Sequence, residues 1–307
     1  MKHKDFMDIQ VATSDTVQGF QVGDQIVIQT KVDGANASIR YDEDTDTVVS
    51  QSSRNILSPA NTLRGMYEFS QTLDKEKVRD VLGVRYILYG EWCSRHFVEY
   101  SSDAQNKFYC FDVYDMQNET YLPQKDVRDI VSRMGLLYVQ TWYEGKFISW
   151  EHCKSFLNKS AYGEELQEGI VVKNMTRLLD ENNRLPFYVK IVNQAFRETA
   201  KASHKKEGLS SEKQAEYDKY TDIVKTIVTL PRVRKILLKG VDEGIIPENW
   251  GTKDMGTIAK WIPKEVFADC LKEEAETVAS VPEFIKFSSK ISMNIVRDML
   301  EEKTQYV

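Results

Sequence analysis

Hydrophobic and polar positions alternate along residues 22–191 in short runs separated by turn residues. Such alternation is typical of strands that bury one face. The pattern predicts eight strands, at 25–30, 36–41, 47–51, 85–91, 107–114, 137–142, 168–174 and 186–193. Helical spacing predicts four inserted helices, at 59–72, 74–82, 123–134 and 149–159. Strands with irregularly inserted helices predict an α+β fold with antiparallel sheets.

The pattern changes after residue 197. Residues 201–216 are polar and contain no large apolar run, which is typical of a hinge or surface segment. Helical periodicity then covers 217–229, 231–239, 252–261, 263–278 and 282–302, with Gly and Pro between the segments. We therefore expect a strand-rich domain over residues 1–204 and a small all-helical domain over residues 205–307.

Composition and cysteine usage indicate an intracellular protein. The 307 residues are 29% charged and 41% hydrophobic, which is ordinary for a globular chain with a substantial core. No apolar stretch approaches the roughly 20 residues that span a membrane, and the N-terminus has no signal-peptide core. The four cysteines are scattered, so reduced thiols are favoured over disulfides, and neither Cys93 with His96 nor His152 with Cys153 has a zinc-ribbon spacing. We expect a cytoplasmic monomer (in the host cytoplasm if a virus encodes it) that binds no membrane.

The net charge of −6 excludes a uniformly basic surface but not a nucleic-acid partner, because binding depends on local basic faces. Three segments could form such a face, at 197–201, 204–206 and 232–235. Each is equally compatible with an ordinary solvated helix surface.

The segment Lys31-Val32-Asp33-Gly34, followed by Asn36, lies between two predicted strands. Lysine amines perform covalent chemistry when their surroundings favour the neutral form. A glycine allows the backbone to turn tightly beside a ligand, and Asp33 and Asn36 could supply polar anchors. An ordinary hairpin turn is the alternative, since this short motif occurs by chance in many proteins.

Five further segments follow in a fixed order, and each presents ionisable residues in or beside a strand-like run. They are 53–55 (SRN), 88–92 (LYGEW), 108–113 (FYCFDV), 168–173 (EGIVVK) and 187–191 (FYVKI). Together with the Lys31 motif, this series resembles the covalent nucleotidyltransferase superfamily of DNA ligases, RNA ligases and mRNA-capping enzymes. The Lys31–Asn36 motif, the FYCFD run and the segment 192–198 resemble the RNA ligase 2 group most. The resemblance covers about residues 20–200 and implies an ATP-grasp-like nucleotidyltransferase core of antiparallel sheets with flanking helices.

The resemblance implies an ATP-dependent RNA ligase that seals 5′-phosphate and 3′-hydroxyl RNA ends through a lysyl-AMP intermediate. It favours nicks in duplex RNA, and the joining of single-stranded ends remains open. Lys31 is the expected nucleophile on the α-phosphorus of ATP. Glu168 and Lys190 are the expected catalytic partners, with Glu168 toward Mg²⁺ (or Mn²⁺) and Lys190 on the α-phosphate. The expected nucleotide contacts come from Asp33, Gly34, Asn36, Arg54, Glu91, Phe111 and Lys173.

Among these contacts, the resemblance places Glu91 toward the ribose and Phe111 against the adenine ring. It places Arg54 on the nucleotide or on the end being joined, and Lys173 beside Lys190 at the phosphates. Without the resemblance, Glu91 and Glu168 would be taken as strand charges that discourage aggregation, and Phe111 as core packing.

The C-terminal pattern separates members of the superfamily, and one position departs from the superfamily's common motifs. DNA ligases and capping enzymes typically add an OB barrel after the core, whereas the pattern here predicts helices, as in the RNA ligase 2 group. The last motif is commonly K-x-K, but this chain has Lys190-Ile191-Val192, so Arg197 or Lys173 would have to supply the missing charge. A DNA ligase, a GTP-dependent capping guanylyltransferase and a non-catalytic RNA-end-binding protein remain as alternatives.

Overall fold

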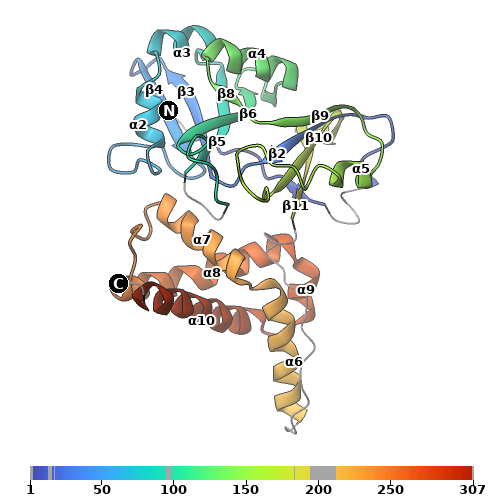
Figure 1. Cartoon of the computed structure of the whole chain (residues 1–307), viewed down its shortest axis with the longest axis vertical. Helices are drawn as coiled ribbons and strands as arrows, with labels where there is room; N and C mark the ends of the chain where they lie inside the picture. The colour runs from blue at the N-terminus through green and yellow to red at the C-terminus, as the bar shows by residue number, and fades with distance from the viewer. Residues whose placement is uncertain are drawn as a thin grey trace. The chain divides into compact units, whose positions relative to one another are not determined.

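The computed structural model describes residues 3–12, 16, 18–94, 98–182, 184–193 and 212–305. The chain forms two compact units, Met1–Asn193 and Gln194–Val307 (Figure 1). The predicted boundary between residues 204 and 205 lies outside the described residues and stays a prediction.

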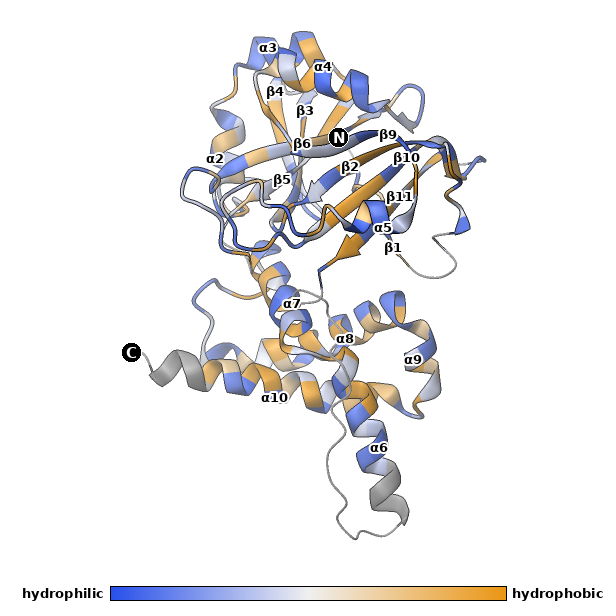
Figure 2. Cartoon of the chain, turned by 45° about the vertical axis from the view of Figure 1, so that its right-hand side comes forward, coloured by the Kyte–Doolittle hydropathy of each residue, from blue (hydrophilic) through white to orange (hydrophobic). Residues whose placement is uncertain are grey.

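The first sheet of the N-terminal unit has five strands in the order β1-β11-β10-β2-β9. They are β1 (Gln10–Val11), β11 (Leu185–Val192), β10 (Gly169–Asp180), β2 (Gln25–Lys31) and β9 (Thr141–Lys146). Neighbouring strands are antiparallel except β1 and β11, which are parallel. Ile28, Val172 and Val189 lie on one face and pack against Phe20, Phe147 and the short helix α5 (Trp150–Lys154). Figure 2 shows the apolar residues of β10 and β11 in orange.

The second sheet carries three of the helices described in this unit. Its main path is β4-β3-β5-β6-β7, and β8 pairs in parallel with β6. The strands are β4 (Thr47–Ser52), β3 (Ala35–Asp42), β5 (Tyr86–Cys93), β6 (Lys107–Asp115), β7 (Thr120–Tyr121) and β8 (Leu137–Tyr138). The helices α2 (Met66–Gln71), α3 (Lys75–Leu82) and α4 (Gln124–Met134) pack on one face, where Val78 and Val131 meet Ile39 and Leu88. The opposite face is therefore available for a site.

The C-terminal unit is helical in its described part. It contains α6 (Glu212–Ile227), α7 (Leu230–Asp242), the 3₁₀ turn η1 (Thr252–Asp254), α8 (Met255–Glu273), α9 (Ala275–Ser280) and α10 (Phe284–Gln305). Its own core includes Val224, Ile236, Ile262 and Val296. The α+β class, the antiparallel sheets and the helical C-terminal region are confirmed. Within the described residues, no helix is both long and apolar enough to cross a bilayer.

The basic segments differ from the expectation. Arg232 is fully buried, and its guanidinium contacts Asp269 at 2.9 Å and Glu273 at 3.4 Å, both on α8. The prediction that Arg232 contributes to a basic surface is therefore wrong. Arg234 and Lys235 are exposed on α7. The segments 197–201 and 204–206 lie outside the described residues.

Several predicted elements have different bounds: the helix expected at 149–159 is only α5, Trp150–Lys154, and the strand expected at 168–174 extends to Asp180. The helix expected from residue 59 begins at Met66, because Leu63, Arg64 and Gly65 have positive φ angles that no helix accommodates. The strand expected over 137–142 is divided between β8 and β9, which belong to different sheets. Pro263 begins no helix but lies inside α8, because the buried face of Ile258, Ile262 and Val266 continues in register across it.

Candidate active site

Lys31 is the last residue of β2 in the first sheet, and Ala35 begins β3 in the second sheet. β2 pairs with β9 and β10, whereas β3 pairs with β4 and β5. The segment 32–34 is therefore a crossing between two sheets and not a hairpin turn. This crossing places Lys31 at the junction between the two sheets.

Three rows of paired residues on β2, β10 and β11 show which side chains share a face with Lys31. The rows are Lys31–Gly169–Val192, Gln29–Val171–Lys190 and Val27–Lys173–Tyr188. Paired residues point to the same side of a sheet, and so do residues two apart in a strand. Lys31, Lys173 and Lys190 therefore belong to one face of the first sheet. Val192, at the position of the second lysine of K-x-K, is in the same row as Lys31.

Lys31 and Glu168 form an ion pair. The Nζ atom of Lys31 donates to Oε2 of Glu168 over 2.6 Å, and the two side chains are 22% and 8% exposed. Glu168 directly precedes β10, and its carbonyl accepts the N–H of Asn193 at 2.8 Å. The backbone thus fixes Glu168 beside Lys31, and the carboxylate stabilises the ammonium form of the lysine.

The second sheet contributes Asn36 and Glu91, which are paired between β3 and β5. A Cβ atom at Gly34 would lie 2.8 Å from Cγ of Glu91 and 2.6 Å from the carbonyl oxygen of Trp92, so glycine is required by close contact. The pKa of the Glu91 carboxyl is raised to about 8, mainly by burial and also by the charges of Glu168 and Asp33. The charge of Lys31 and a hydrogen bond from the Gly34 N–H oppose this rise.

Phe111 lies at a β-bulge. Tyr89 pairs with Asp112 and Gly90 pairs with Cys110, so Phe111 is an extra residue of β6 without a partner on β5. A bulge interrupts the alternation of side chains and redirects them. Phe111 and Asp112 consequently line the same cavity although they are consecutive.

Asp112 holds Lys173 in a buried network between the two sheets. Nζ of Lys173 donates to Oδ2 of Asp112 and to the carbonyl of Phe111, both at 2.8 Å. Gln124 and Tyr188 donate to Oδ1 of Asp112 at 2.7 and 3.2 Å. Burial raises the pKa of the Asp112 carboxyl and lowers the pKa of the Lys173 ammonium, while their mutual attraction opposes both shifts.

A cavity of about 110 Å³ lies between the sheets and brings many of these residues together. Its lining consists of Phe6, Ile9, Gln29, Thr30, Lys31, Val32, Asn36, Glu91, Phe111, Asp112, Val139, Val171 and Lys173. Lys31 and Glu91 lie at one end of the cavity, and Lys173 lies at the other. On β10, Gly169 pairs with Lys31, and Lys173 is four residues further along the strand. At about 3.3 Å per residue, the two ends are separated by about 13 Å along the strands.

Several predicted site residues lie elsewhere among the described residues. Asp33 is outside the cavity lining: its carboxylate accepts the N–H of Val98 and its own N–H donates to the Tyr100 hydroxyl, each at 2.7 Å. Arg54 is exposed in the turn after β4 and also lies outside this lining, as does the partly buried Lys190. Glu168 is not among the lining residues either, but it contacts Lys31, which is. Arg197, suggested as a replacement for the missing lysine, is outside the described residues.

Metal-binding groups are sparse in the described part of the chain. No cluster of three or more His, Cys, Asp and Glu side chains occurs there. Cys93, Cys110, Cys153 and Cys270 are buried thiols, and burial raises the pKa of Cys93 to about 12. His96 lies outside the described residues. Two carboxylates, Glu91 and Glu168, nevertheless flank Lys31, and Mg²⁺ commonly uses one or two carboxylates together with water and substrate phosphates.

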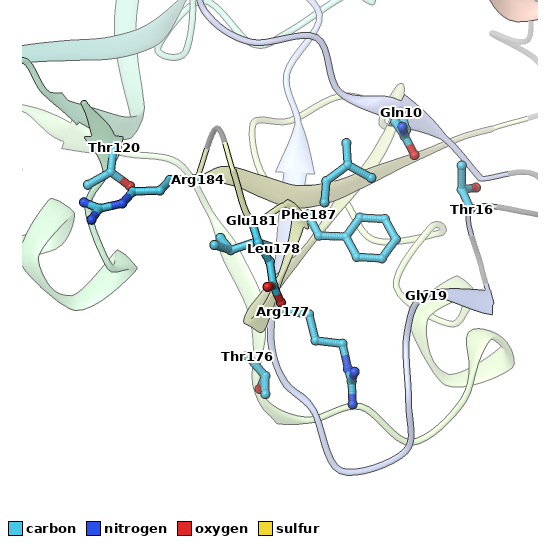
Figure 3. Close-up of a pocket in the computed structure, with 11 residues that line it drawn as sticks. Gln10, Thr16, Gly19, Thr120, Thr176, Arg177, Leu178, Glu181, Arg184 and Phe187 are labelled. Carbon is cyan, nitrogen blue, oxygen red and sulfur yellow. The ribbon is translucent and has the colours of Figure 1, made fainter. Parts of the chain in front are cut away.

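A second, larger depression of about 1160 Å³ lies at the opposite end of β10 and β11 (Figure 3). Its lining includes Arg177, Glu181, Arg184 and Phe187. Arg177 contacts Asp24 at 2.9 Å. None of the predicted nucleotide contacts is among its described lining residues, so the cavity beside Lys31 is the candidate site.

Sequence reasoning missed eight of the cavity's lining residues, among them Phe6, Ile9, Gln29 and Asp112. Asp112 directly follows Phe111, and its acidic side chain inside an otherwise apolar run was the available signal. In the N-terminal segment the available signal was the alternation of Met7, Ile9 and Val11 with polar residues, part of which forms β1.

Comparison with known proteins identifies similarity over the part of the chain that contains most of the candidate site. The model of the family described as "RNA ligase" matches residues 24–192. Among solved structures, an RNA ligase from Naegleria gruberi with PPi has a TM-score of 0.44 and 15% identity, covering 64% of this chain and 57% of the other. An archaeal ATP-dependent RNA ligase has a TM-score of 0.48 and 13% identity, covering 91% of this chain and 66% of the other. The chain thus spans less than two thirds of the length of these proteins. No curated protein matches the chain significantly.

Proposed function

Because the chain belongs to the RNA ligase family, we propose that it joins 5′-phosphate and 3′-hydroxyl ends of RNA with ATP, through a lysyl-AMP intermediate on Lys31. The observation that supports this most is the ion pair of Lys31 with Glu168, because Lys31 lines a cavity together with Phe111 and Glu91. A nucleophilic amine, a carboxylate pair and an aromatic ring are the groups that this chemistry needs.

In the proposed first step, the Lys31 amine attacks the α-phosphorus of ATP. A bond forms between Nζ and phosphorus, and the bond to the pyrophosphate oxygen breaks. The attacking amine must be neutral, so its contact with Glu168 has to be released and its proton lost before attack. A divalent cation bound beside Glu168 and Glu91 would neutralise phosphate charge and compete with Lys31 for the Glu168 carboxylate.

The remaining residues hold the nucleotide. Lys190, on the same face as Lys31 and one row away, is the proposed α-phosphate contact. Phe111 offers a ring for base stacking, and Asn36 and Glu91 face the space between base and phosphate. In two further steps, AMP moves to the RNA 5′-phosphate, and the 3′-hydroxyl displaces it.

Lys173 has a different proposed role from the phosphate contact that the resemblance implied. Its ammonium is 2% exposed and is held by Asp112 and the Phe111 carbonyl. Its position lies about 13 Å along the strands from the row of Lys31. We therefore assign Lys173 to positioning Phe111 and Asp112 at the base end of the cavity.

The test is incubation of the protein with magnesium and α-³²P-ATP. We expect covalent label on Lys31 in the wild-type protein and none in Lys31→Ala. Glu168→Ala and Lys190→Ala should each remove about 2–4 kcal/mol of transition-state stabilisation and slow labelling accordingly. Label from α-³²P-GTP but not from ATP would contradict the ligase proposal and favour capping.

The RNA substrate is tested separately with a nick in duplex RNA, single-stranded RNA ends and a nick in duplex DNA. We expect sealing of the RNA nick to be fastest. Labelled protein that seals only DNA would identify a DNA ligase, and labelled protein that seals nothing would limit the activity to self-adenylylation.

A further inference from the structure

The N-terminal residues Lys4–Met7 cross the face of the second sheet that lies opposite its helices. The hydroxyl of Tyr89 donates to the carbonyls of Lys4 and Asp5 at 2.9 and 3.3 Å. The N–H of Met7 donates to the hydroxyl of Tyr121 at 3.0 Å. The backbone of this segment is therefore fixed to β5 and β7, although it has no regular secondary structure.

These contacts place the Phe6 ring against the proposed base-stacking residue. The ring centroids of Phe6 and Phe111 are 4.9 Å apart, and the ring planes meet at 66°. Phe6 also contacts Tyr89 at 5.2 Å and Tyr121 at 5.3 Å. Phe6 and Ile9 both line the cavity that contains Phe111, so they belong to the surface that a bound base would meet.

The other end of the segment reaches the proposed phosphate contact. Gln10 and Val11 pair with Val189 and Lys190 of β11, and the N–H of Ala12 donates to the Lys190 carbonyl at 3.1 Å. The segment 4–12 thus connects the proposed base end of the site with the strand that presents Lys190.

We propose that Phe6 is a positioning residue for the nucleobase of ATP and contributes to base selection, an inference that rests on the proposed function. A base stacked on Phe111 would meet the Phe6 ring at a steep angle, so the two rings would restrict both its tilt and its in-plane position. The remaining space is small, since 110 Å³ is below the roughly 300–1,000 Å³ of common ligand pockets. The base enters by a shift of Phe6 away from Phe111, after which the Phe6 ring contacts the bound base.

The test compares Phe6→Ala, Phe6→Leu and Phe6→Trp in the full-length protein. We expect the KM for ATP in self-adenylylation to rise about tenfold in Phe6→Ala, which corresponds to about 1.4 kcal/mol. The preference for ATP over GTP should fall, and Phe6→Trp should restore most of both values because it keeps an aromatic ring. Phe156→Leu is the matched control for Phe6→Leu, since Phe156 packs on the other face of the first sheet and should leave KM unchanged.

An unchanged KM and an unchanged ATP/GTP preference in Phe6→Ala would overturn the inference. So would a lower KM, because it would mean that the ring merely excludes the nucleotide. The added fluorescence of Phe6→Trp should be quenched by ATP even without covalent labelling. If wild-type protein is not labelled but ATP still quenches this fluorescence, the proposed ligase function fails while the role of Phe6 stands.

Discussion

Lys173 and Asp112 form the most deeply buried ion pair among the described contacts, with side chains 2% and 0% exposed and 2.8 Å between charged atoms. Replacing Lys173 by Met keeps the approximate volume but leaves the Asp112 carboxylate in a buried site without a cation. Breaking a buried pair in this way costs about 3–5 kcal/mol of folding free energy. We expect Lys173→Met and Asp112→Asn each to destabilise the N-terminal unit by that amount at pH 7.

The double variant should cost at least about 2 kcal/mol less than the sum of the single variants, because the second substitution removes a charge that is already unpaired. The loss in Lys173→Met should also depend on pH. Burial raises the pKa of Asp112, and removing the ammonium removes the attraction that opposed this rise. A carboxyl with a raised folded-state pKa destabilises the fold increasingly as pH rises, so the loss should be larger at pH 8 than at pH 5.

Buried cysteines give a separate measurement for each unit. Cys110 lies in β6 beside Phe111, whereas Cys270 lies in α8 of the helical unit, and both are buried. Pulsed thiol labelling across a urea series, with mass spectrometry of the two peptides, should show a shift for Cys110 and none for Cys270. The coupled buried pair would be refuted if the double variant's loss of folding free energy equalled the sum of the single losses within about 0.5 kcal/mol. A loss below about 1 kcal/mol in Lys173→Met would refute it as well.

Three other variants test particular features of the structure. Without divalent cations, wild-type protein should lose stability as pH rises from about 4.5 to about 8, because burial raises the pKa of Glu91 to about 8. Glu91→Gln should remove this loss. Parallel pH–stability curves for the two proteins would contradict the expectation. Val192→Lys should accelerate self-adenylylation about tenfold, since position 192 is in the same row as Lys31 and its backbone lies about 10 Å away, within reach of a lysine side chain. An equal gain in the uncharged control Val192→Met would argue against a charge effect. Arg232→Met should destabilise the helical unit, measured at Cys270, by about 3–5 kcal/mol. The control double variant Arg234→Ala/Lys235→Ala should leave this unit stable. Equal effects of the two changes would mean that Arg232 is not a buried partner of Asp269.

Most strands of the N-terminal unit were predictable because each buries at least one apolar face, and period-two alternation is a local property. β2, β3, β4 and β11 begin and end within about one residue of the predicted bounds. Helix α3 was equally accessible, since Asp74 accepts the N–H groups of Glu76 and Lys77 as an ordinary N-cap. Elements governed by local sequence are the ones that pattern analysis finds.

The contacts that assemble the candidate site were not predictable from local patterns. Lys173 and Asp112 are 61 residues apart and belong to different sheets, and no periodicity relates them. The positive φ angles of Leu63 and Arg64, which shorten α2, also depend on a distant partner. The Trp92 side chain, from β5, donates a hydrogen bond to the Arg64 carbonyl. Tertiary partners decide such positions, and a single sequence does not identify those partners.

The unpaired residue at position 111 has a consequence for insertions and deletions in β6. Deleting one residue between Lys107 and Phe111 would absorb the bulge and give β6 a continuous ladder with β5. Phe111 would then pair with Gly90 and point into the core, at the position that Cys110 now occupies, while the pairs outside the deleted stretch would keep their faces. A deletion that improves backbone pairing would thus abolish the base end of the site. Point substitutions at residue 111 are therefore a tolerable route to altered base preference, whereas length changes in this strand are not.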